Sequence, residues 1–105
     1  MLEELKVEDI DIYTDLMTHE GNIGLFFHLP GHCAGCKRAL GILEKKDLSN
    51  WKILLVNADI DDFKTLVHQF DVTTAPSLVY KQADAKSTMK VSGLRNFLEI
   101  QNIFD

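Results

Sequence analysis

The stretch IGLFFHLPGHCAGCK (residues 23–37) decides the fold. It begins with a nearly unbroken apolar run over residues 23–29, which is typical of a strand buried on both faces. A helix is expected to follow, starting around Cys33 and Cys36 and ending near Lys46. Cysteines at this spacing across a first helical turn can form a disulfide with little distortion. The free N–H groups and the positive end of the helix dipole favour the thiolate at Cys33. We therefore predict that Cys33 is the attacking sulfur and that Cys36 resolves the mixed disulfide.

The rest of the chain predicts strands and helices that alternate around this unit. A second apolar strand over residues 52–58 would lie parallel to the first, because a strand, a helix and a strand in this order form a right-handed crossover. The other expected elements are a helix over residues 8–20, a helix beginning at Asp61 and Asp62, hairpin strands over residues 77–81 and 88–91, and a last helix from Leu94 to about residue 103. The pattern predicts an α/β fold in which residues 1–105 form a single domain, with a central mixed sheet of four to five strands flanked by helices.

Composition and charge exclude several function classes. The 105 residues carry a net charge of −5, and residues 1–20 hold seven acidic residues and one lysine. An acidic chain without a basic stripe is unsuited to nucleic acid, and its apolar runs are too short to span a membrane. The acidic N-terminal segment does not resemble a secretory signal, so we expect a cytoplasmic protein. Cytoplasmic thiols are normally reduced, and a close cysteine pair there is expected to be catalytic or metal-binding rather than structural.

Several segments resemble the thioredoxin family, in which a CxxC motif accompanies a parallel strand–helix–strand unit. Here the motif is followed by Lys37, and residues 56–59 are similar to the segment that ends the next strand in that family. Residues 70–77 resemble the family's loop that ends in a cis-proline, here Pro76, and Gly93 lies after the hairpin, where thioredoxins also carry a glycine. The similarity covers about residues 23–104.

The resemblance implies a thioredoxin-like fold and a small thiol–disulfide oxidoreductase that cycles between dithiol and disulfide without a cofactor or a metal. It implies a cis peptide bond before Pro76, which would face the cysteines, and a backbone at Ala75 that pairs with an extended segment of a disulfide-containing protein. Thr74, His32 and Gly93 complete the substrate-binding residues that we assign on this basis. Electrons would come from a reductase or from a low-molecular-weight thiol.

The chain also departs from the family pattern. The dipeptide between the cysteines is Ala34-Gly35 where thioredoxins usually have Gly-Pro, and His32 replaces the usual tryptophan. Phe27 and Leu55 stand where the family carries a buried acid and its companion lysine, so we expect one apolar pair beneath the cysteines and no carboxylate route for their deprotonation. Strand alternation places His28 on the face opposite Phe27, and we expect a packed histidine that points away from the cysteines.

Three other readings of the cysteine pair stay open. The cysteines could carry a metal or an iron–sulfur cluster, although a structural zinc site needs four ligands and a second subunit would have to supply the rest. The chain could be a non-catalytic adaptor that docks through its acidic N-terminal segment. The pair could also be inert. His32 either raises the thiolate population when it is protonated or is a simple exposed loop residue.

Overall fold

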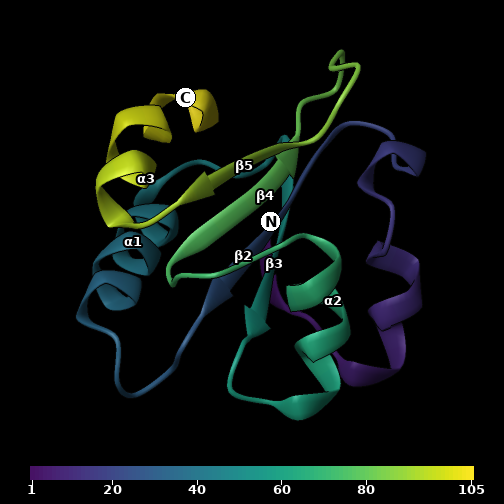
Figure 1. Ribbon diagram of the computed structural model, residues 1–105. Coiled ribbons are helices and arrows are strands. Elements are labelled where there is room, and N and C mark those ends of the chain that lie inside the picture. Colours follow the sequence, from purple (N-terminus) through teal and green to yellow (C-terminus); the bar gives the residue numbers. More distant parts are fainter.

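The computed structural model describes residues 1–105 and contains a five-stranded mixed sheet with helices on both faces (Figure 1). The strands lie in the order β1-β3-β2-β4-β5. Their bounds are β1 Leu2–Glu4, β2 Asn22–His28, β3 Trp51–Asn57, β4 Ser77–Lys81 and β5 Met89–Ser92. The α-helices are α1 Ala34–Lys45, α2 Lys64–Gln69 and α3 Leu94–Ile100. No helix has the length and apolar character needed to cross a lipid bilayer.

The centre of the sheet is the strand–helix–strand unit that the sequence predicts. β2 and β3 pair in parallel and are joined by α1, whereas β4 pairs antiparallel with β2 and with β5. β2 is buried from Ile23 to His28, which confirms the prediction of a strand covered on both faces. The predicted hairpin after Pro76 is also present.

Two hydrophobic clusters cover the two faces of the sheet. One cluster contains Phe27 and Val56 and packs against Leu66 of α2. The other contains Phe26 and packs against α1 and α3, which lie together on one side of the sheet in Figure 1. Successive side chains along a strand point to opposite faces of the sheet. The face to which a strand residue points therefore determines which helices its side chain contacts.

The predicted helix over residues 8–20 is wrong. The chain forms two short 3₁₀ helices instead, Val7–Tyr13 and Leu16–Thr18. The break between them lies at Asp15, whose backbone is extended and whose carboxylate accepts a hydrogen bond from the Met17 N–H at 3.0 Å. A side chain that caps a new turn in this way competes with a continuous helix.

Strand β1 is an element that the sequence does not predict. It is three residues long, only Leu2 in it is partly buried, and it pairs in parallel with β3 from Leu2↔Ile53 to Glu4↔Leu55. The helices after residue 60 are shorter than predicted. Residues 61–63 and 101–104 are 3₁₀ turns at the ends of α2 and α3.

Candidate active site

Cys33 and Cys36 are joined by a disulfide at the start of α1, with their Cα atoms 5.2 Å apart. Cys33 is the N-cap residue of α1 and has an extended backbone. It lies in the loop that follows β2, at the end of the sheet. Cys36 lies in the first turn of the helix and is 2% exposed, whereas Cys33 is only partly buried. The prediction that the two sulfurs can bond is confirmed.

The first turn of α1 donates to the sulfur of Cys33. The Cys36 N–H donates a hydrogen bond to Cys33 Sγ at 3.1 Å, in the manner of an N-cap side chain. The N–H of Gly35 makes no hydrogen bond and is one of the free donors of the helix end. This arrangement favours negative charge on Cys33 Sγ in the reduced protein.

The loop before β4 faces the cysteines. The Ala75–Pro76 peptide bond is cis, as the resemblance implies. Cys33 Sγ lies 3.8 Å from the carbonyl oxygen of Ala75, and a Cβ atom on Gly35 would lie 3.4 Å from Pro76 Cδ. The Gly93 N–H donates to the Pro76 carbonyl at 2.8 Å. The structure thus brings five of the predicted positions, 33, 36, 75, 76 and 93, together at one end of the sheet.

Thr74 and His32 flank this centre. Thr74 is exposed, and its carbonyl accepts a hydrogen bond from the Ser77 hydroxyl at 2.6 Å, which holds the turn that precedes Pro76. His32 Nε2 lies 2.6 Å from Asp59 Oδ2, and the two side chains are 59% and 45% exposed. Asp59 is a contact that our sequence reasoning missed. The available signal was that both residues follow neighbouring parallel strands, whose carboxyl ends meet at the same edge of a sheet.

The expected apolar pair of Phe27 and Leu55 does not form. Phe27 is in register with Val56, and Leu55 is in register with Phe26, so Phe27 and Leu55 point to opposite faces. Phe27 is fully buried on the α2 side, where it lines a cavity of about 170 Å³ with Thr74 and other residues but without a cysteine.

The expectation that His28 points away from the cysteines is also wrong. His28 does lie on the face opposite Phe27, but that face is the one on which α1 packs. His28 therefore lines a cavity of about 200 Å³ together with Cys36, Lys37 and Leu40. His28 is 8% exposed as a residue, and burial lowers the pKa of its side chain from the ordinary value of 6.5.

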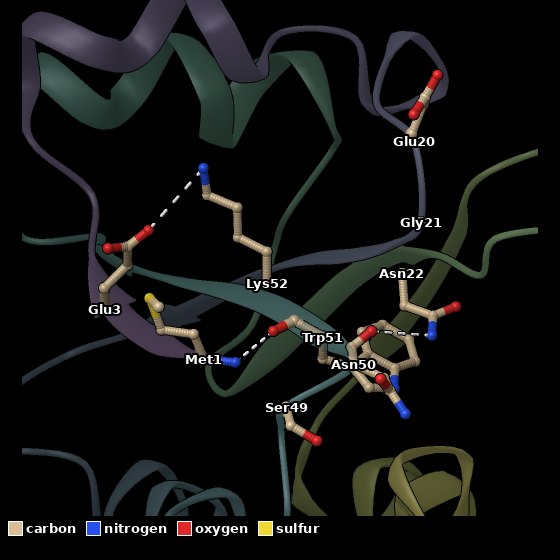
Figure 2. A pocket seen from close by; sticks show the side chains of 9 residues that line it. All are labelled: Met1, Glu3, Glu20, Gly21, Asn22, Ser49, Asn50, Trp51 and Lys52. Atoms are coloured by element: carbon tan, nitrogen blue, oxygen red, sulfur yellow. Dashed lines mark hydrogen bonds and ion pairs between the residues drawn. The ribbon is translucent and has the colours of Figure 1, made fainter.

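The largest hollow on the surface, about 410 Å³, lies at the opposite end of the sheet (Figure 2). Figure 2 shows the Met1 amino group beside the Trp51 carbonyl and the Lys52 amine near the Glu3 carboxylate. These residues sit at the amino ends of β2 and β3, so this hollow is not part of the cysteine site. The structure brings no three His, Cys, Asp or Glu side chains into an arrangement that could hold a metal ion.

The comparisons with known proteins show the fold. No family model matches the chain, and no curated protein is significantly similar in sequence. Among solved structures, thioredoxin O1 from Arabidopsis thaliana in its oxidised state has a TM-score of 0.73 at 16% identity, over 98% of this chain and 92% of that one. The germline-specific thioredoxin Deadhead from Drosophila melanogaster has a TM-score of 0.70 at 18% identity, over 98% and 95%. Fasciola hepatica thioredoxin has a TM-score of 0.69 at 16% identity, over the whole of both chains. This protein therefore has an α/β thioredoxin-like fold with a disulfide in a CxxC arrangement.

Proposed function

We propose that this protein is a thiol–disulfide oxidoreductase that reduces disulfides in other proteins through Cys33 and Cys36. One observation carries the proposal: Cys33 Sγ accepts an N–H from the first turn of α1 while it is bonded to the buried Cys36. A helix end that stabilises a thiolate, next to a second sulfur within bonding reach, is the arrangement that disulfide exchange requires.

The two cysteines divide the reaction between them. The Cys33 thiolate attacks one sulfur of a substrate disulfide, forms a mixed disulfide and releases the first substrate thiolate. The Cys36 thiolate then attacks Cys33 Sγ, which closes the Cys33–Cys36 disulfide and releases the second substrate thiolate. Two electrons pass from the dithiol to the substrate. Cys33 is assigned the first step because it is the more accessible of the two residues, whereas Cys36 is 2% exposed.

The loop opposite the cysteines would bind the substrate. An extended substrate segment can pair with the backbone of Ala75, whose carbonyl lies 3.8 Å from Cys33 Sγ. Thr74, Pro76, Gly93 and His32 complete the proposed substrate-binding residues; the Ser77 hydroxyl holds the Thr74 carbonyl and the Gly93 N–H holds the Pro76 carbonyl. No cofactor takes part. A reductase or a low-molecular-weight thiol would restore the dithiol in a reducing compartment such as the cytoplasm.

Trapping and alkylation test this division of roles. The Cys33 thiol should alkylate before the Cys36 thiol, Cys33→Ser should abolish reduction of a protein disulfide, and Cys36→Ser should accumulate mixed disulfides with substrate. Faster alkylation of Cys36 would reverse the assignment. A reduced sample that binds stoichiometric iron or zinc and reduces no disulfide would contradict the proposal and favour metal carriage by the same sulfurs.

A further inference from the structure

His28 is a buried titratable side chain for which the two-cysteine reaction has no assigned role. It is the last residue of β2 and lies on the face that α1 covers, next to Phe26, with ring centroids 5.8 Å apart. The ring nitrogens make no hydrogen bond to the protein, and no fully enclosed polar side-chain atom lacks a partner. The ring nitrogens of His28 therefore reach the cavities beside them.

One of the cavities beside His28 connects it with Cys36, and another connects it with Glu4. The larger one, about 200 Å³, is lined by His28 and Cys36, and its volume allows a water molecule to bridge the ring and the sulfur. A second cavity of about 100 Å³, which His28 also lines, has Glu4 of β1 and Asn57 of β3 in its wall. The ionisable groups that face His28 are thus Cys36 and Lys37 from α1 and Glu4 from β1.

The electrostatics of this site suit a proton acceptor. Burial holds the pKa of His28 below its ordinary value, and the Glu4 carboxylate acts in the opposite direction. The ring is consequently neutral at neutral pH, with a free nitrogen that can take a proton. Glu4 would stabilise the imidazolium that then forms, because an opposite charge favours the protonated ring.

We infer that His28 accepts the proton of the Cys36 thiol when Cys36 attacks the mixed disulfide. The inference rests on the proposed function and deepens its second step. No carboxylate shares the cavity with Cys36. Phe27 points to the other face, and Asp59 is engaged by His32.

The Cys36 S–H proton passes through one water molecule to a ring nitrogen of His28 and leaves the Cys36 thiolate. The thiolate forms a bond to Cys33 Sγ as the bond between Cys33 Sγ and the substrate sulfur breaks. The substrate sulfur leaves with the electron pair as a thiolate, and the imidazolium returns its proton to that thiolate or to solvent.

An aromatic disulfide separates the two chemical steps in one experiment. Reduced protein mixed with dithiobis(nitrobenzoate) should release one coloured thiolate when Cys33 attacks and a second when Cys36 resolves. In His28→Phe, which keeps an aromatic ring in the packed position, we expect the first phase to be unchanged and the second to slow by on the order of 10²-fold at neutral pH, the lower end of general-base effects. His68→Phe, on the exposed surface of α2, is the matched control and should change neither phase.

The pH profile distinguishes proton transfer from a packing effect. The second phase of the native protein should rise through a titration below pH 6.5, level off, and rise again with the thiol. His28→Phe should lose the first inflection and keep only the thiol's own titration. Equal rates and equal profiles in the native protein and in His28→Phe would overturn the inference. Absence of a second phase in the native protein would instead remove the proposed function, and the inference with it.

If His28→Phe does not fold, an NMR titration of His28 in the native protein tests the same inference. The ring-proton NMR signal of His28 should titrate with two inflections in the reduced native protein, one from its own ring and one from Cys36. Reduced Cys36→Ser should show only the first inflection. Identical titration curves in the two proteins would show that the ring and the sulfur do not communicate, which refutes the inference.

Discussion

Replacing Gly35 with proline should make the protein a stronger reductant. The Gly35 N–H lies in the first turn of α1 and makes no hydrogen bond, so it is available to the Cys33 thiolate in the reduced protein. Proline lacks this donor and is tolerated in a first helical turn. A hydrogen bond to a charged group contributes about 1.5 kcal/mol at the lower end of the usual range, which suits a partly exposed sulfur. For a two-electron couple this free energy corresponds to about 30 mV.

The direction of the shift in reduction potential depends on which redox state loses the hydrogen bond from the Gly35 N–H. Removing an N–H from the neighbourhood of the thiolate destabilises the reduced form, so the disulfide becomes harder to reduce and the potential more negative. We expect the native potential to be less negative than the value of about −270 mV for thioredoxin, and Gly35→Pro to lie about 30 mV below the native value. Equilibration with a glutathione buffer, read by counting thiols, measures both.

The Gly35→Ala variant separates the effect of the N–H donor on the reduction potential from the effect of a stiffer backbone. Alanine keeps the N–H and removes the conformational freedom of glycine, and its Cβ would make an ordinary contact of 3.4 Å with Pro76 Cδ. If the N–H donor controls the reduction potential, the potential of Gly35→Ala should be close to the native value, and only the potential of Gly35→Pro should become more negative. Equal shifts in the two variants, or a less negative potential in Gly35→Pro, would refute the reasoning.

Four further expected outcomes concern the free energy of unfolding. Phe27→Ala should lower the free energy of unfolding in urea by about 3–5 kcal/mol, because the ring is fully buried; a loss below 1 kcal/mol would contradict the packing described. Gly93→Ala should cost about 1–3 kcal/mol, since Gly93 has φ +85° and ψ 158°, a conformation that is essentially restricted to glycine. Gly41→Ala in α1, with open space around its Cβ, should stabilise by up to about 1 kcal/mol and serves as the control. The lowered pKa of His28 means that the unfolded chain binds the proton more readily, so stability should fall as pH drops below 6.5 towards the folded-state pKa, and His28→Phe should flatten this slope.

The central unit could be predicted because its signals are local. Two apolar runs, a CxxC motif and the turn after the second run are each contained in about ten residues, and they place Cys33 and Cys36 correctly at the start of α1. The cis bond at Pro76 came only from the resemblance, since X–Pro bonds are cis in about 5–6% of cases. Local pattern alone would have favoured the trans form.

The elements that were missed depend on distant partners. β1 has little burial of its own and becomes a strand only because β3, some fifty residues later, offers it a backbone partner. The pairing of His32 with Asp59 likewise joins two loops. His28 shows a subtler limit. Its face of the sheet followed from alternation, but its relation to Cys36 depended on which face α1 covers, and this is a property of the packed structure.

The two short outer strands also affect how copies of this molecule meet at high concentration. β1 is three residues long and carries Glu3 and Glu4, and β5 is four residues long and carries Lys90. An unpaired edge of this length, with charged side chains, offers a neighbouring chain few groups for intermolecular sheet formation. The long apolar strands β2 and β3 would promote intermolecular pairing if they lay at an edge of the sheet, but each is paired with a strand on both sides. Growth of the sheet from one molecule into the next is thereby disfavoured without any need for a covering helix.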